Sequence, residues 1–196
     1  MGAPMRSIAA VVIGASTGGV EALLRILPAL RGDASFSVLV VLHLPRERSS
    51  LLVEIFAPRC NLPVREVLDK DPILAGSIYF APPDYHLLVD DGPCLALSMD
   101  PPVEHSRPSV SVLFESAAAV YGPHLLAVLL TGAGSDGASG LQAVQRAGGM
   151  TVVQHPANAR MPQMPEAGLA RVTADHVLTL EDIMSLFQAL PCAGRA

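Results

Sequence analysis

The chain has 196 residues, of which 51% are hydrophobic and 16% charged, and its formal net charge is −5. This length fits one domain with a full-sized core, and the acidic balance argues against nucleic acid or an anionic membrane as a partner. The three cysteines, at positions 60, 94 and 192, have neither metal-site nor disulfide spacing, which is typical of a reducing cytoplasm.

Strand and helix patterns alternate along the chain. The short apolar run at residues 8–13 predicts a first strand rather than a signal peptide, because it leads directly into a glycine-rich turn. Further buried strands are predicted at residues 36–42, 64–67, 125–130, 150–154 and 176–178. Helices are predicted at residues 20–30, 49–58, 110–120, 138–147, 163–170 and 181–190.

The pattern changes in the middle of the chain. Short segments at residues 77–80, 86–89 and 95–97 predict an antiparallel patch near a sheet edge, and Asp91-Gly92 is a hairpin signal between the last two. We therefore predict an α/β fold, namely a doubly wound, mostly parallel sheet with helices on both faces and a short antiparallel edge hairpin. No apolar run is long enough to span a bilayer, so we expect no membrane insertion.

The glycine-rich turn after the first strand is the most informative motif. Residues 14–19 read Gly-Ala-Ser-Thr-Gly-Gly, which places Ser16 between a strand end and a helix start. Free backbone N–H groups at a helix N-terminus favour negative charge. A serine nucleophile at this place therefore has an oxyanion site as its neighbour.

A nucleotide-binding turn is the alternative interpretation of the same residues. A dinucleotide fingerprint needs Gly-x-Gly-x-x-Gly, and Ser16 stands where the second glycine belongs. A P-loop needs a Gly-Lys-Ser/Thr ending, and the turn contains no lysine. A dinucleotide site also needs an acid near the end of the second strand, where this chain has His43.

Polar side chains follow four predicted strands at their carboxyl ends. Ser16, His43 and Asp136 follow the strands at 8–13, 36–42 and 125–130, and His155 follows the strand at 150–154. Ligands of doubly wound sheets bind at these ends, so the side chains are expected to converge. A hydroxyl, an imidazole and a carboxylate are the components of a serine hydrolase triad.

Each of these residues also has a structural interpretation. Ser16 and Asp136 precede predicted helices, where both residue types are favoured N-caps. His43 alone is typical of a partly buried surface residue, and His155 is its rival as the base. The joint occurrence of the three groups at one end of the sheet favours the triad.

Several residues are candidates for the wall of the cleft. Arg107 precedes a predicted helix that Ser109 caps, and it is interpreted either as part of a structural loop or as a cleft wall that guides an acidic protein surface. Residues 84–86 are expected at the cleft rim. Arg46 and Arg48 are similar candidates, although exposed arginines are usually only solvated.

Four motifs then occur in chain order: the turn at 14–19, His-Leu-Pro at 43–45, Arg-Pro-Ser-Val at 107–110 and Thr-Gly-Ala-Gly-Ser-Asp-Gly at 131–137. They resemble the CheB-type protein-glutamate methylesterases of bacterial chemotaxis, over nearly the whole chain. The chain departs from the family pattern at three places. Ala133 replaces the usual Met, Ser135 replaces a frequent Asn, and Leu-Pro-Arg at 44–46 replaces Met-Pro-Pro.

This resemblance implies a mechanism. Ser16 is the expected nucleophile, His43 the general base and later acid, and Asp136 the carboxylate that orients the imidazole. The implied substrate is a γ-glutamyl methyl ester on a helical receptor domain, and some receptor glutamines are deamidated by the same acyl-enzyme route. Neither a metal nor an organic cofactor is implied. The expected oxyanion and substrate-binding residues are Thr17, Ala133 and Arg107.

Typical family members also carry an N-terminal receiver domain, whereas the first predicted strand begins almost at Met1 here. We therefore expect residues 1–196 to form a single catalytic domain without a receiver domain, either open constitutively or controlled by a separate regulatory protein. The expected partner is the cytoplasmic helical domain of methyl-accepting receptors, and the family precedent is a monomer. A receptor-binding module of the same fold with little or no turnover is the alternative, which an intact triad set disfavours.

Overall fold

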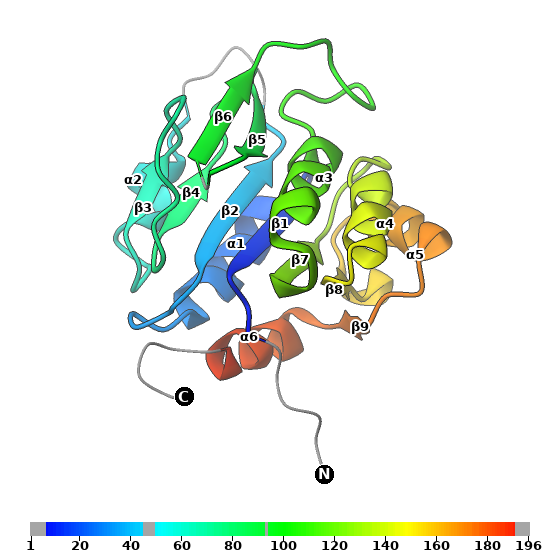
Figure 1. Cartoon of the computed structure of the whole chain (residues 1–196). Coiled ribbons are helices and arrows are strands. Elements are labelled where there is room, and N and C mark those ends of the chain that lie inside the picture. The colour runs from blue at the N-terminus through cyan, green and yellow to red at the C-terminus, as the bar shows by residue number, and fades with distance from the viewer. Residues whose placement is uncertain (1–6, 45–49, 93, 191–196) are drawn as a thin grey trace.

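The computed structural model describes residues 7–44, 50–92 and 94–190, and a parallel sheet forms the centre of this described part (Figure 1). Its strands are β1 (Ala10–Ala15), β2 (Ser37–Leu42), β3 (Val64–Glu66), β4 (Ile78–Phe80), β7 (Leu125–Leu129), β8 (Met150–Gln154) and β9 (His176–Leu178). They lie side by side in the order β3-β4-β2-β1-β7-β8-β9, and every neighbouring pair is parallel.

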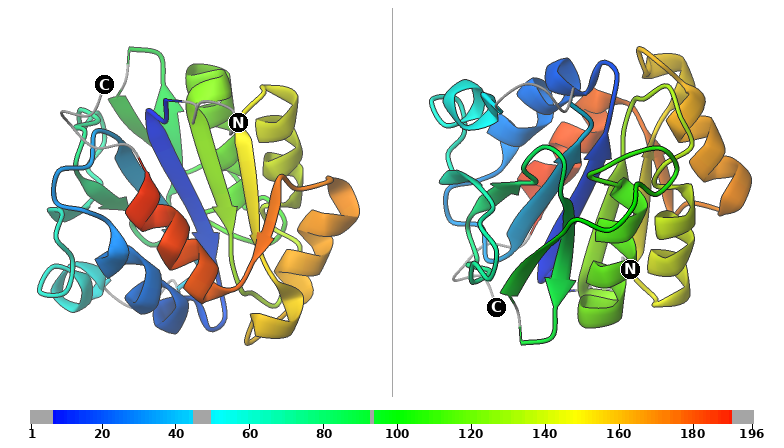
Figure 2. Two further views of the ribbon diagram at one scale, coloured as in Figure 1. Left: turned by 90° about the horizontal axis from the view of Figure 1, so that it is seen from below. Right: turned by 90° about the horizontal axis from the view of Figure 1, so that it is seen from above.

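Helices and a hairpin cover both faces of the sheet. The elements are α1 (Gly19–Ile26), η1 (Leu27–Ala29), α2 (Leu52–Phe56), β5 (His86–Asp90), β6 (Cys94–Ser98), α3 (Val110–Tyr121), η2 (Gly122–His124), α4 (Ala138–Arg146), η3 (Pro156–Asn158), α5 (Gln163–Arg171) and α6 (Leu180–Ala189). The cluster on one face contains side chains of α1, α2 and α6, and that on the other contains side chains of α3, α4, α5 and the hairpin β5–β6. Figure 2 shows α6 in front of the sheet in its left view and the hairpin and α3 in front in its right view.

The central strands are apolar throughout because both of their faces are covered. Along β1, Val11 and Ile13 belong to one core cluster and Ala10 and Val12 to the other, as the alternation of side chains in a strand requires. Burying an aliphatic side chain of this size contributes about 1.5–3 kcal/mol relative to leaving it exposed. Both faces of these strands therefore contribute to the hydrophobic core.

The topology reverses direction at β1, which has β2 on one side and β7 on the other. Crossovers between parallel strands are almost always right-handed, so α1, which leads from β1 to β2, and α4, which leads from β7 to β8, lie on opposite faces. The loops that follow β1, β2 and β7 meet at this reversal. In open α/β sheets, such a point is where ligands bind.

The predicted fold class is confirmed, with one correction in the segment of residues 77–97. β4 is not part of the antiparallel patch but lies parallel between β2 and β3. Its Ile78 and Phe80 enter one core cluster and Tyr79 the other, and burial on both faces is typical of an inner parallel strand. β5 and β6 pair antiparallel as predicted, but they form a separate two-stranded sheet that packs on α3.

Most other predicted elements agree with the observed ones within one or two residues. β1 is an example, since it begins at Ala10 and not at residue 8. The predicted helix at 49–58 is shorter in the structure, where α2 comprises Leu52–Phe56. None of the helices in the described ranges is both long and apolar enough to cross a membrane.

Candidate active site

Ser16 lies in the tight turn between β1 and α1, and this turn is fixed by backbone contacts. The Ser16 N–H donates to the carbonyl of Thr131 (2.9 Å), and the Ser16 carbonyl accepts from the N–H of Gly19 (2.7 Å). The N-cap of α1 is Gly18, which has a φ of 83°, and no side chain caps this helix. The interpretation of Ser16 as a helix cap is therefore wrong, and its hydroxyl is available for other contacts.

His43 lies next to Ser16 because of the register of two central strands. β1 and β2 pair in parallel with Ala15 opposite Leu42, so the residues that follow are neighbours on adjacent strands. The His43 N–H donates to the carbonyl of Ala15 (3.1 Å), which extends this pairing beyond the strand ends. Adjacent strands are about 4.8 Å apart, so the imidazole and the serine hydroxyl project from neighbouring backbones.

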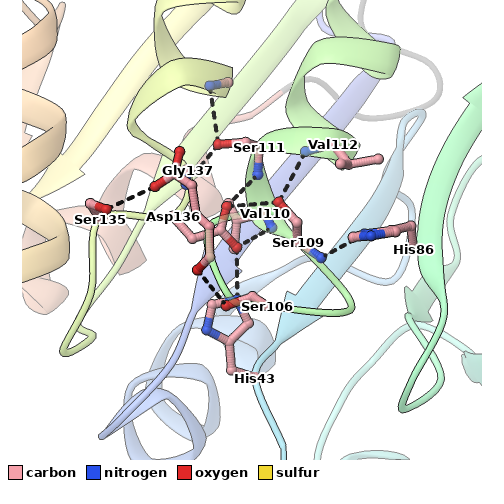
Figure 3. A network of polar contacts seen from close by, with 12 residues as sticks. His43, His86, Ser106, Ser109, Val110, Ser111, Val112, Ser135, Asp136 and Gly137 are labelled. Atoms are coloured by element: carbon pink, nitrogen blue, oxygen red, sulfur yellow. Dashed lines mark hydrogen bonds and ion pairs between the residues drawn. The ribbon is translucent and has the colours of Figure 1, made fainter. Parts of the chain in front are cut away.

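The carboxylate of Asp136 connects His43 to the N-terminus of α3 (Figure 3). Its Oδ2 lies 2.8 Å from Nε2 of His43 and accepts from the N–H of Val110 at 2.7 Å. Its Oδ1 accepts from the hydroxyl of Ser109 at 2.8 Å and from the N–H of Ser111 at 3.0 Å. Asp136 therefore binds α3 rather than capping α4, whose N-cap is Gly137.

These contacts keep a buried carboxylate charged. The side chain of Asp136 is only 2% exposed, and burial alone would raise its pKa. The hydrogen bond from His43 and the backbone N–H groups of Ser111 and Val110 outweigh burial, so the pKa lies below its usual value. An ionised carboxylate at a helix N-terminus is also favoured by the helix dipole. Asp136 is therefore an anion at neutral pH and can stabilise a positive charge on the imidazole.

The two ring nitrogens of His43 have different surroundings. Nε2 faces a carboxylate, which only accepts, so Nε2 carries the proton of the neutral ring and Nδ1 is left as a base. Within the described residues, neither His43 Nδ1 nor the Ser16 hydroxyl has a hydrogen-bond partner. Catalytic hydrogen bonds are often loose before substrate binds, and they tighten in the complex. The arrangement therefore leaves Nδ1 and the hydroxyl of Ser16 free for other contacts.

Unused backbone donors lie on the loop after β7 and on the serine turn. Thr17 and Ala133 are exposed, and in the part of the chain that the structure describes their N–H groups have no partner. Gly132 lets the loop pack against the serine, because an added Cβ would lie 2.9 Å from Cβ of Ser16 and 1.9 Å from Sδ of Met164. The oxyanion role of the N–H groups of Thr17 and Ala133 stays a prediction.

A cleft of about 120 Å³ opens beside the imidazole, with lining residues that include His43, Leu44, His105 and Arg107. The Arg107 guanidinium donates to Oδ1 of Asp84 through Nη2 (2.8 Å) and to the carbonyl of Met99 through Nη1 (2.9 Å). Arg107 thus organises a loop and also forms part of the cleft wall. Its role in substrate binding stays a prediction.

The remaining candidates lie elsewhere. His155 is exposed, and its Nδ1 accepts from the N–H of Ala157 (3.2 Å), so Asp136 pairs with His43 and not with this rival. His86, which was expected at the cleft rim, is buried. Arg46 and Arg48 lie outside the described residues. In the described ranges, no group of three or more His, Cys, Asp or Glu side chains is placed to hold a metal ion.

Sequence reasoning missed the donors that surround Asp136. They are the Ser109 hydroxyl and the N–H groups of Val110 and Ser111, which come from a segment far away in the chain. One sequence signal could have pointed to these donors: Ser109 is predicted from the sequence as the cap of the helix that became α3. It does cap that helix, because its hydroxyl accepts from the N–H of Val112 at 3.4 Å.

Comparisons with known proteins identify the family of this chain. Residues 11–187 match the family model described as CheB methylesterase. A relative in Leptospira interrogans serogroup Icterohaemorrhagiae serovar copenhageni (strain Fiocruz L1-130) is 40% identical over 178 residues, which are 91% of this chain and 92% of that protein. A relative in Anaeromyxobacter dehalogenans (strain 2CP-C), named protein-glutamate methylesterase/protein-glutamine glutaminase 1, is 42% identical over 177 residues.

The coverage of these relatives differs. The Anaeromyxobacter match includes 89% of this chain but only 50% of that protein, so the chain spans about half the length of such relatives. A solved structure, the Thermotoga maritima CheB methylesterase catalytic domain, matches 92% of this chain and 100% of its own, with a TM-score of 0.85 and 30% identity. Sequence and fold thus lead to the same conclusion: the chain belongs to the CheB methylesterase family.

Proposed function

We propose that this chain is a protein-glutamate methylesterase that hydrolyses γ-glutamyl methyl esters with Ser16, His43 and Asp136. The observation that carries the proposal is the hydrogen bond between Nε2 of His43 and the buried carboxylate of Asp136 (2.8 Å), on a histidine that is adjacent to Ser16 in the sheet register. The names of the relatives support the same reaction and add protein-glutamine deamidation.

Acylation begins at the serine. His43 Nδ1 takes the hydroxyl proton while Oγ of Ser16 attacks the ester carbonyl carbon. The negative charge that develops on the carbonyl oxygen accepts hydrogen bonds from the N–H groups of Thr17 and Ala133. Collapse of the tetrahedral intermediate breaks the bond to the methoxy oxygen, which takes the proton from Nδ1 and leaves as methanol.

Deacylation repeats these steps with water. His43 Nδ1 takes a proton from a water molecule whose oxygen attacks the acyl carbon, and the bond to Oγ of Ser16 then breaks. Oγ recovers the proton, and a free glutamate side chain is released. Asp136 stays ionised throughout and stabilises the imidazolium that forms twice in the cycle. With a glutamine substrate, ammonia leaves in place of methanol.

The expected partner is the cytoplasmic helical domain of methyl-accepting receptors, since this is where a methylated glutamate would be presented to an exposed cleft. We propose that the chain acts in the cytoplasm as a monomer, and that it neither binds nucleic acid nor inserts into a membrane. The net charge of −5 disfavours binding to nucleic acid and to an anionic membrane surface, since both are negatively charged. A separate regulatory protein is the proposed means of control.

Methanol release from a methylated receptor domain tests the proposal. The Ser16→Ala variant should lose at least about 10⁴-fold in kcat, since removal of a triad serine leaves only the contribution of binding and the oxyanion donors. Ser185→Ala is the matched control, because this exposed serine lies on α6 away from the site. Equal activity of the Ser16→Ala variant contradicts the proposal. Receptor binding without methanol release would instead favour a binding module.

A further inference from the structure

His86 is a buried imidazole at the start of β5 that takes no part in the proposed reaction. It is 2% exposed, and each ring nitrogen has a backbone partner. Nε2 lies 3.1 Å from the carbonyl oxygen of Pro101, and Nδ1 lies 3.1 Å from the backbone nitrogen of Ser109. A carbonyl only accepts and an N–H only donates, so Nε2 carries the proton and Nδ1 is the acceptor. The ring is therefore neutral, in one defined tautomer.

The partner of His86 leads directly to the carboxylate of the triad (Figure 3). Ser109 is fully buried, and its hydroxyl donates to Oδ1 of Asp136 at 2.8 Å. The next two residues donate their N–H groups to the same carboxylate, and Asp136 in turn holds Nε2 of His43. A continuous chain of hydrogen bonds thus runs from His86 through Ser109 and Asp136 to the proposed base.

The element that carries His86 is firmly attached to α3. The hairpin β5–β6 buries Leu87, Val89 and Leu95 in the same core cluster as Leu113 and Phe114 of α3. These hydrophobic contacts continue in a polar one, since the N–H of Val89 donates to the hydroxyl of Ser116 at 3.1 Å. The hairpin is therefore held against the helix by both apolar and polar contacts.

A second contact holds the same segment. Asp84, two residues before His86, accepts from Nε (3.0 Å) and Nη2 (2.8 Å) of Arg107, which stands two residues before Ser109. The backbone at residues 107–109 is thereby fixed at both ends by residues 84–86. This double attachment sets the place from which α3 begins, and α3 with its N-cap Ser109 supplies three of the four donors of Asp136.

We propose that His86 is a positioning residue for the triad: it fixes Ser109 and the N-terminus of α3, and through them the carboxylate of Asp136 and the ring of His43. The kinetic part of this inference rests on the proposed function. Without an acceptor at Nδ1, the buried N–H of Ser109 would be unsatisfied, so the segment would shift to find a partner. Such a shift would misalign the donors of Asp136, and a misplacement of about 1 Å in an active site lowers rates by about 10²-fold.

Two variants of His86 with similar polarity distinguish a role in positioning the triad from a role in fold stability alone. In His86→Asn, the amide oxygen branches from Cγ as Nδ1 does, so the acceptor for Ser109 is kept. In His86→Gln, the polar end lies one bond further out, near the place of Nε2, so that acceptor is lost. We expect kcat for methanol release to fall about 10- to 100-fold in His86→Gln with KM changed less than about twofold, and His86→Asn to recover most of the loss.

A spectroscopic measurement tests the same inference without a substrate. The ring N–H proton of His43 that is shared with Asp136 should give a protected downfield NMR signal in wild type and in His86→Asn. In His86→Gln, the signal should broaden or disappear because the carboxylate no longer holds the ring. Ile183→Val is the stability control, since this buried residue of α6 lies in the opposite core cluster and should lower the melting temperature without altering the signal.

The outcomes are distinguishable. If His86→Gln keeps both kcat and the His43 signal, or if Asn is no better than Gln, the positioning role is overturned. If the NMR signals behave as expected and wild type releases no methanol, the positioning role stands and the proposed function fails. Should His86→Gln not fold, the Asn variant decides: we expect its kcat within about fivefold of wild type, and a loss as large as that of a triad variant overturns the inference.

Discussion

The two halves of the proposed site differ in how completely their polar groups are paired. The half formed by Asp136 and the start of α3 is buried, and the carboxylate has four donors at 2.7–3.0 Å. The half formed by the turn at Ser16 and the loop at Ala133 is open, and within the described residues the N–H groups of Thr17 and Ala133 have no partner. The polar groups of the first half are all paired before substrate binds, whereas the second half, the incomplete half, still has unpaired backbone donors.

This contrast agrees with what the proposed reaction would require of each half. The charge on Asp136 exists before, during and after the reaction, so its donors are best fixed in advance. The charge on a substrate oxyanion exists only in the tetrahedral intermediate, so donors that meet it must have no stronger partner in the resting protein. The fold supplies the first from a helix N-terminus and the second from two exposed loops.

Removing the charge from the half whose polar groups are all paired should have a larger effect than removing a backbone donor from the open half. In Asp136→Asn, a neutral amide replaces the anion, and its NH₂ group opposes donors that now point at it. We expect kcat for methanol release to fall about 10⁴-fold, as for the loss of the carboxylate from other serine hydrolase triads. Asp182→Asn, at an exposed carboxylate of α6, is the control and should keep wild-type kcat. A decrease of less than tenfold in Asp136→Asn would contradict the assigned role.

The incomplete half is tested by deleting one backbone donor. Ala133→Pro removes an N–H group without removing any catalytic side chain, and loss of one oxyanion donor lowers kcat by about 10²–10³-fold. Ala133→Met keeps the N–H group and introduces the residue usual in the family, so it should retain activity. Steady-state kinetics of both variants, at equal melting temperature, make the comparison. A fully active proline variant would show that this loop does not bind the oxyanion.

The packing of the open loop gives a smaller effect. Gly132→Ala would place a methyl group 1.9 Å from Sδ of Met164 and 2.9 Å from Cβ of Ser16. Overpacking of this kind costs about 1–3 kcal/mol of unfolding free energy, and it should also displace the serine and lower kcat. Gly134→Ala, in the same loop with no atom within 4 Å of the added Cβ, is the matched control. Urea unfolding should separate the two variants, and equal stability would contradict the described packing.

The smallest expected effect is on the pH dependence of stability. The pKa of Asp136 is lowered in the folded state, so its ionisation stabilises the fold at pH values above the unfolded pKa of about 3.9. That contribution is lost as pH falls through the lower pKa of the folded state. The unfolding free energy of wild type should therefore decrease more steeply below about pH 4 than that of Asp136→Asn. Parallel curves for the two proteins would show that the carboxylate is not stabilised as described.

The sequence was sufficient for most of the sheet and for the strand ends that carry the site, because both depend on local patterns. The apolar run of β1 and the polar residues after β1, β2 and β7 are visible without a structure. The prediction that placed Ile78–Phe80 in the antiparallel patch was wrong. A three-residue apolar strand has the same sequence pattern in an inner parallel position and in a hairpin. Only burial of both faces separates the two.

The surroundings of Asp136 depend on contacts between distant segments. Its position before a helix predicts a cap for α4, whereas the neighbouring helix α3 presents its N-terminus closer to the carboxylate. His86 is similar, since its role depends on the hairpin packing on α3. Residue types and spacing indicate that such groups are polar and near a turn. They do not indicate which helix end will be opposite them.

Covalent labelling tests the central claim most directly, because it reports whether His43 activates Ser16. The protein is incubated with a fluorophosphonate, and the mass and position of the adduct are determined for wild type and for His43→Ala. The account predicts a single adduct on Ser16 that forms far more slowly in the variant. An adduct on another residue, or a labelling rate that does not depend on His43, would contradict it.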